Sequence, residues 1–342
     1  MARSVEVTVD VSSAVDLGEV LHTKATVTYP DPQDLQARPI VCFGFPGGGY
    51  SRGYFTFDMP GSSVGGQAGW HADRGWVFVS CDHVYVGESD YPSEPGLLTL
   101  ENLAAANAAA VEWVSSKLRD GSLTGDLPPI PDFTRIGIGQ SMGGCLTIVQ
   151  QGQHATYDGI GILGYSAHHT VLAMPPGGPE AAAPWVPRGS TSVRVLRSPQ
   201  TSTNPDFRAR EDGLPISTWG FHHDDEPADI VGEDMTDYPT RHGKKLPWAS
   251  ATTPPIATTM MSPGVVAPEA AAITAPVLVA VGERDVCPAP KFEPLSYQSS
   301  SDITVYVCPQ MSHMHNFAST RTLFWTRIES WATGVAAAKA QR

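Results

Sequence analysis

Six short, nearly continuous apolar runs constrain the fold of this chain more than any other feature. Each is six to eight residues long, and the runs are 39–45, 75–82, 135–140, 159–166, 275–282 and 302–308. Strands with this pattern are typical of parallel sheets, because other elements cover both faces of such a sheet. The runs therefore predict a parallel sheet that is buried on both faces.

Two segments near the N-terminus follow a different pattern. Residues 5–11 and 25–29 alternate between apolar and polar side chains, which predicts antiparallel strands open to water on one face. Helix-forming stretches (97–118, 141–151 and 321–340) separate the apolar runs. Alternating strands and helices favour an α/β fold. We expect a mostly parallel sheet with flanking helices and an antiparallel N-terminal pair of strands at one edge.

Residues 167–270 interrupt this alternation of strands and helices. The segment is rich in Pro, Ala, Ser and Thr and shows no clear periodicity, so a disordered linker is one interpretation. It also carries several aromatic residues, which disordered segments usually lack. These are Trp185, Trp219, Phe221, Tyr238 and Trp248. We therefore expect a core formed by residues 1–166 and 271–342, with 167–270 inserted as a cap over the sheet.

Charge and cysteine content narrow the function classes. The formal net charge of −13 disfavours nucleic acids and anionic membranes as partners. The five cysteines are odd in number and lie mostly in apolar runs, which favours buried free thiols in a reducing compartment. Neither a signal sequence nor an apolar window of 18 residues is evident. These features predict a soluble cytoplasmic protein; its oligomeric state cannot be predicted.

The sequence GIGQSMGG, residues 137–144, contains a G-x-S-x-G motif centred on Ser141. Ser141 follows a short apolar strand and begins a helical run, which is the context of a nucleophile elbow. Gly139 and Gly143 suit a turn too tight for side chains at these positions. The backbone N–H of Met142, at the N-terminus of the new helix, is well placed to stabilise an oxyanion.

A serine nucleophile needs an acid and a histidine, each just after a later strand. Asp285 follows the run 275–282, and His313 follows the run 302–308. We interpret Ser141, Asp285 and His313 as a catalytic triad. Two alternative acids, Glu283 and Asp302, are disfavoured because Glu283 comes too early in its turn and Asp302 opens a strand. His315 is the alternative base or, if His313 is the base, a residue of the substrate pocket.

With these residues the sequence resembles the α/β-hydrolase superfamily over residues 20–166 and 271–340. FGFPGGGY (43–50) is similar to the oxyanion loop of that family, with Phe43 or Pro46 where the usual histidine stands. CDHVYVGESDYP (81–92) is similar to its D-x-x-G-x-G-x-S segment, with Tyr85 replacing the first glycine.

The resemblance implies a hydrolase of the serine type with an acyl-enzyme intermediate. Besides Met142, the second oxyanion donor is expected from the N–H groups of Gly47 and Gly48, or from Phe45 under the other alignment. No metal or organic cofactor is expected. FHHDDEP (221–227) could ligate a metal, but it lacks a fixed zinc-site spacing and is interpreted as a solvated turn.

Hydrolysis of a carboxylic ester or lactone is the expected reaction, by analogy with the family. An aromatic insertion suggests a medium-sized, partly apolar small-molecule substrate. Besides His315, we expect His168 and Tyr85 to contact it. The alternatives are a C–C bond hydrolase, an amidase, or a non-catalytic protein of the same fold that binds small molecules. A haloalkane dehalogenase is disfavoured because it would need Asp in place of Ser141.

Overall fold

The computed structural model describes residues 2–61, 64–177, 185–189, 210 and 212–341. Their centre is one eight-stranded sheet with the strand order β1-β2-β4-β3-β5-β6-β7-β8. The strands are β1 (Arg3–Asp10), β2 (His22–Tyr29), β3 (Ile40–Phe45), β4 (Val77–Cys81), β5 (Thr134–Gln140), β6 (Gly159–Leu163), β7 (Val277–Arg284) and β8 (Ile303–Ser312).

The pairing of the strands confirms the predicted sheet. β1 pairs antiparallel with β2, and β2 pairs antiparallel with β4. From β4 to β8 every neighbouring pair is parallel, so the carboxyl ends of these six strands meet at one edge. Each of the eight predicted strands corresponds to an observed one. The antiparallel pair lies at the edge of the sheet, as expected.

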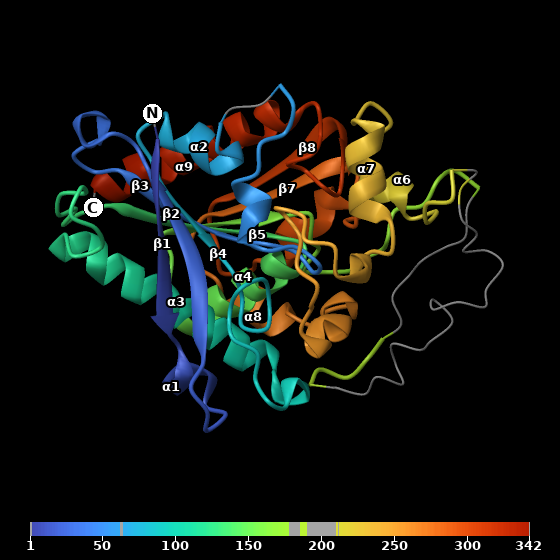
Figure 1. Ribbon diagram of the computed structural model, residues 1–342, viewed down its shortest axis with the longest axis horizontal. Coiled ribbons are helices and arrows are strands. Elements are labelled where there is room, and N and C mark those ends of the chain that lie inside the picture. Colours follow the sequence, from blue (N-terminus) through green and yellow to red (C-terminus); the bar gives the residue numbers. More distant parts are fainter. Residues whose placement is uncertain (1, 62–63, 178–184, 190–209, 211, 342) are drawn as a thin grey trace.

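Helices cover the two faces of the sheet (Figure 1). α3, α4 and α8 lie on one face, and α2 and α9 lie on the other. The described α-helices are α1 (Ser12–Val15), α2 (Gly66–Ala72), α3 (Leu100–Asp120), α4 (Met142–His154), α6 (Thr218–Phe221), α7 (Ala228–Met235), α8 (Ala267–Ala272) and α9 (Arg321–Ala340). The three predicted helical stretches correspond to α3, α4 and α9.

The core follows from the alternation of side chains along the buried strands. In β3, Val41 and Phe43 point to the face of α3 and α4, and belong to the hydrophobic cluster there. Ile40 and Cys42 belong to the cluster on the opposite face, beneath α2 and α9. This two-sided burial explains why these strands are nearly continuous apolar runs. All five cysteines are buried and unpaired, as expected.

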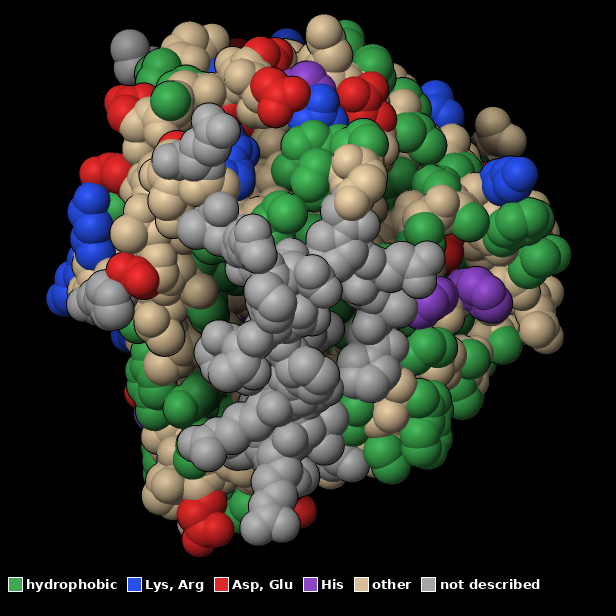
Figure 2. Space-filling model, turned by 90° about the vertical axis from the view of Figure 1, so that its right-hand side faces the viewer, with side chains coloured by type: hydrophobic (Ala, Val, Ile, Leu, Met, Phe, Trp, Pro, Cys, Tyr) green, Lys and Arg blue, Asp and Glu red, His purple; other side chains and the backbone are tan. Residues whose placement is uncertain are grey.

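The segment 167–270 is described in part: α6 and α7 lie beyond the carboxyl ends of the parallel strands, at the right of Figure 1, and α8 packs against α4. The described part contains α6, α7, α8 and short 3₁₀ turns. Figure 2 shows this side of the molecule, on which many hydrophobic side chains gather. That the segment forms a separate cap remains a prediction. In the described part of the chain, no helix is both long and apolar enough to cross a membrane.

Candidate functional site

Ser141 stands at a strained turn between β5 and α4. Its φ of 52° and ψ of −115° are rare for a residue with a side chain. The turn is closely packed: a Cβ on Gly139 would lie 2.1 Å from the carbonyl oxygen of Gly143, and one on Gly143 would lie 2.2 Å from that of Phe45. The two glycines are therefore required for the backbone to form this turn.

Asp285 and His313 meet at the carboxyl ends of β7 and β8. Asp285 Oδ1 lies 2.6 Å from His313 Nδ1, and both side chains are buried. The backbone N–H groups of Gly282 and Val286 also donate to this carboxylate. Burial alone would raise the pKa of Asp285, but His313 and His315 together hold that pKa well below its usual range. A charged Asp285 requires the hydrogen of a neutral His313 to be on Nδ1, which leaves Nε2 as an acceptor.

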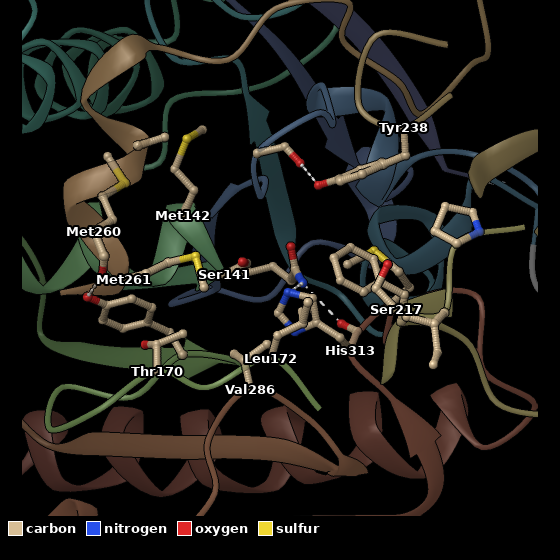
Figure 3. Close-up of a pocket in the computed structure, with 18 residues that line it drawn as sticks. Ser141, Met142, Thr170, Leu172, Ser217, Tyr238, Met260, Met261, Val286 and His313 are labelled. Carbon is tan, nitrogen blue, oxygen red and sulfur yellow. Dashed lines mark hydrogen bonds between the residues drawn. The ribbon is translucent and has the colours of Figure 1, made fainter. Parts of the chain in front are cut away.

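His313 and Ser141 line the same pocket (Figure 3). Within the part of the chain that the structure describes, the Ser141 hydroxyl makes no hydrogen bond. The Gln140 amide nitrogen lies 3.4 Å from His313 Nε2. The same nitrogen donates to the backbone carbonyl of His313 at 3.0 Å. His313 Nε2 and the Ser141 hydroxyl therefore share a pocket, and no hydrogen bond joins them in the described structure.

His315 also binds Asp285. Its Nε2 lies 2.7 Å from Asp285 Oδ2, so each carboxylate oxygen receives one imidazole. Burial lowers the pKa of His315, and its Nδ1 has no hydrogen-bond partner in the described chain. His315 is thus a neutral donor to the carboxylate. It does not line the pocket.

The pocket has a volume of about 510 Å³ and mostly apolar walls. Three methionines, Met142, Met260 and Met261, lie to one side of Ser141, and His313 lies to the other (Figure 3). Its lining consists of Gly48, Gln140, Ser141, Met142, Tyr165, Thr170, Leu172, Pro215, Ile216, Ser217, Phe221, Tyr238, Ala257, Met260, Met261, Val286, His313 and Met314. No Asp, Glu, Lys or Arg is among these described residues.

The loop after β3 has its carbonyls occupied and two of its N–H groups free. The carbonyl of Pro46 faces His83, and that of Gly47 accepts from the N–H of Tyr50. Tyr238 donates its hydroxyl to the carbonyl of Gly48 at 2.7 Å. By contrast, the N–H groups of Gly47 and Gly48 donate to no described residue, and neither does that of Met142. Three N–H groups near Ser141 are thus available to a ligand.

Comparisons with solved structures agree with this architecture. The chain is similar to proline iminopeptidase from Mycobacterium smegmatis at 17% identity, with a TM-score of 0.59 over 98% of this chain and 100% of that one. It is similar to an enol-lactonase from Burkholderia xenovorans at 14% identity, with a TM-score of 0.56 over 92% of this chain and 97% of that one. It is also similar to an esterase from Thermogutta terrifontis at 14% identity, with a TM-score of 0.55 over 97% of this chain and 99% of that one. The chain has the α/β-hydrolase fold. No protein-family model and no curated protein matches its sequence.

Within this α/β-hydrolase fold, the residues predicted for the site are only partly brought together. Met142 and Gly48 line the pocket. Gly47 packs against the elbow, since a Cβ there would lie 3.1 Å from the Cβ of Ser141. The second donor expected from this loop, including the alternative Phe45, remains a prediction.

The residues predicted to contact substrate lie outside the pocket wall. Tyr85 packs its ring against Tyr91, with ring centroids 5.1 Å apart. His168 is exposed, and His315 is buried behind Asp285. The walls come instead from residues that sequence patterns did not single out as contacts, above all Tyr238, Met260 and Met261. The only signal for them was the aromatic and apolar content of 167–270.

The alternative acids and the metal-like motif lie elsewhere. Glu283 pairs with His223 at 3.4 Å, and Asp302 is exposed. In the motif 221–227, His222 contacts Glu226 and Asp234. No group of three or more His, Cys, Asp or Glu side chains in the described ranges is arranged to hold a metal ion.

Proposed function

We propose that the protein is a serine hydrolase that cleaves a carboxylic ester or lactone of a medium-sized, partly apolar substrate. The observation that carries the proposal is the Asp285–His313 pair, because the pocket that His313 lines also contains Ser141 at a strained elbow. A histidine held by a buried carboxylate, beside a serine on such a turn, is the arrangement needed to activate a hydroxyl.

The reaction would proceed through an acyl-enzyme. His313 Nε2 takes the Ser141 proton as Oγ attacks the acyl carbon, and Asp285 stabilises the resulting imidazolium. The free N–H groups of Met142 and of the Gly47–Gly48 segment then stabilise the oxyanion, each contributing about 3 kcal/mol. His313 next protonates the leaving alcohol and activates water to cleave the acyl-enzyme. The reaction requires a hydrogen bond between the Ser141 hydroxyl and His313 Nε2, and such catalytic hydrogen bonds often tighten only when substrate binds.

The pocket favours a neutral substrate. Its apolar lining suits an aliphatic or aromatic acyl group, and the described lining residues include no cation for a substrate carboxylate and no carboxylate for a substrate amine. A buried charge without a partner would be costly there. This supports a neutral ester or lactone over the alternative substrates of a C–C hydrolase or amidase that carry a charge close to the scissile bond.

A panel of p-nitrophenyl esters with acyl chains of two to ten carbons tests the proposal. We expect turnover of the neutral esters, with kcat/KM rising with chain length until the pocket is filled. The matched half-ester that ends in a carboxylate should react at least tenfold more slowly. A fluorophosphonate probe should label the protein at Ser141, and Ser141→Ala should abolish labelling.

Absence of both turnover and labelling would contradict the proposal. In that case the apolar pocket would instead favour the non-catalytic alternative, a protein that binds small molecules.

A further inference from the structure

His83 contacts the segment 43–50, which we call the oxyanion loop, from its buried side. It lies two residues after β4, is completely buried, and stacks on Phe45 with ring centroids 5.3 Å apart. Its Nε2 lies 3.2 Å from the carbonyl oxygen of Pro46. Its Nδ1 lies 3.1 Å from the side-chain nitrogen of Asn107 in α3 and 3.3 Å from the side-chain oxygen of the same residue. Both ring nitrogens are therefore engaged.

The direction of these hydrogen bonds is fixed by chemistry. A carbonyl oxygen can only accept, so Nε2 must carry a hydrogen. Burial lowers the pKa of His83 to about 4, and the ring is neutral at pH 7 with a single hydrogen. Nδ1 must then accept, and Asn107 supplies the donor. Because the single ring hydrogen is on Nε2, the Asn107 nitrogen, and not its oxygen, is the partner of Nδ1, and two hydrogen bonds run from Asn107 through His83 to Pro46.

This chain ends on the peptide group that carries the Gly47 N–H. In a trans peptide the C=O and N–H groups point in opposite directions. The only cis peptide in the described ranges is Tyr238–Pro239, so the bond between Pro46 and Gly47 is trans. Holding the Pro46 carbonyl toward His83 therefore turns the Gly47 N–H away from His83. Gly47 itself packs against the Cβ of Ser141.

We infer that His83 and Asn107 are positioning residues that aim the N–H of Gly47 at the oxyanion formed on attack by Ser141. This inference rests on the proposed function. Neither residue lines the pocket, and they act through the backbone of the loop. A rigid, correctly aimed donor lowers the barrier because no reorganisation is needed in the transition state.

A second buried histidine provides the matched control. His71 is also completely buried and stacks on Trp76, but neither of its ring nitrogens has a hydrogen-bond partner in the described chain. Its contacts are those of a core residue alone. Both His83→Phe and His71→Phe replace a buried histidine by phenylalanine, but only His83→Phe also removes a hydrogen bond to the loop. Comparing the two variants therefore isolates the effect of that hydrogen bond.

The first experiment compares these variants on a p-nitrophenyl ester and with a trifluoromethyl ketone, which forms a tetrahedral oxyanion adduct. For His83→Phe we expect kcat to fall roughly 10- to 100-fold and the inhibition constant of the ketone to rise by a similar factor, with KM within about twofold. His83→Gln should recover part of kcat, because its amide can donate to Pro46. His71→Phe should match the wild-type kcat.

Asn107→Asp gives a second readout, which requires no loss of packing volume. A carboxylate at position 107 can only accept, so neutral His83 would carry its hydrogen on Nδ1 and leave Nε2 bare against the Pro46 carbonyl. Besides burial, only Asn107 and Pro46 act on the pKa of His83 in the described chain. The new carboxylate should also raise the pKa of His83, so that in Asn107→Asp the ring is charged at lower pH and loses a proton only at high pH. We therefore expect kcat of Asn107→Asp to decline at high pH, where its His83 becomes neutral, while the wild-type kcat stays level.

The outcomes separate the two proposals. If the wild type hydrolyses no ester and is not labelled at Ser141, the proposed function fails and this inference fails with it. If the wild type is active but His83→Phe behaves like His71→Phe, or Asn107→Asp keeps the wild-type pH profile, the positioning role alone is overturned.

Discussion

Two buried aspartates in this molecule hold histidines, yet they do so in different ways. Asp285 lies at the carboxyl ends of β7 and β8 and binds His313 and His315. Asp234, in α7, is fully buried. Four side chains donate to it, namely Tyr50, His222, Arg241 and Trp248.

The difference lies in what remains free on the histidine. His222 has a carboxylate at each ring nitrogen, Glu226 at 2.6 Å and Asp234 at 3.0 Å. Burial alone would lower the pKa of His222, but these two contacts raise it to about 9, so the ring is charged at neutral pH. His313 has a carboxylate at Nδ1 only, and it lines the pocket. The same residue types thus yield an ion pair in one place and, under the proposed function, an available base in the other.

The largest effect is expected from removing that available base or its serine. Ser141→Ala and His313→Ala should each lower kcat at least a thousandfold on a p-nitrophenyl ester, because the two residues act as a unit. Steady-state kinetics on variants with unchanged thermal unfolding would measure this. The double variant should be little worse than either single variant.

His168→Ala is the control for this comparison. The His168 side chain is exposed and lies outside the pocket, so its loss should leave kcat/KM within about twofold. A large loss would mean that His168 contacts substrate, as the sequence suggested. If His313→Ala keeps most of the activity, Asp285 and His313 form a structural pair like that of Asp234 and His222.

The charged His222 should affect the free energy of unfolding rather than the rate of turnover. The pKa of His222 is about 9 in the folded protein and 6.5 as a reference value. The stabilisation that the charged His222 gives to the folded protein is therefore complete below about pH 6.5 and is lost as pH rises toward 9. The loss should be on the order of 3 kcal/mol, since one pKa unit corresponds to about 1.4 kcal/mol. Urea unfolding at pH 6.0, 7.5 and 9.0 would measure it.

His222→Gln is the matched variant, because glutamine keeps polar atoms at the site without a proton to lose in this range. It should be less stable at pH 6 and should show a flatter dependence between pH 6.5 and 9. An equal slope in both proteins would assign the pH dependence to other groups.

The contrast between the two aspartates also explains what the sequence could reveal. Asp285 and His313 follow apolar strands, and parallel strands bring their carboxyl ends together, so these positions could be predicted from strand order. The eight strands were predictable from six continuous apolar runs and two alternating segments. The contacts of Asp234 join residues far apart in sequence, such as Tyr50 and Trp248, without any periodic pattern. Only the packed structure brings them together.

Two further residues make the same point. Asn107 lies in the stretch 97–118, which the sequence predicts to be a helix, but that pattern does not predict that its side chain is buried against His83. His315 follows His313 by two residues and was expected in the pocket. It instead turns back to Asp285, because the chain after β8 makes a turn there, with the His315 N–H donating to the His313 carbonyl. Such turns depend on local backbone geometry, which a residue pattern does not specify.

The smallest effect, and the sharpest test of which histidine is the base, comes from His315. His315→Phe removes a donor to Asp285 Oδ2 but leaves His313 in place, so we expect kcat to fall about tenfold, in line with one hydrogen bond to a charged group. His315→Gln should keep most of the activity because its amide can still donate. His313→Gln should be crippled, since an amide cannot accept the serine proton. If the His315 variants lose a thousandfold and His313→Gln does not, the roles of the two imidazoles are reversed.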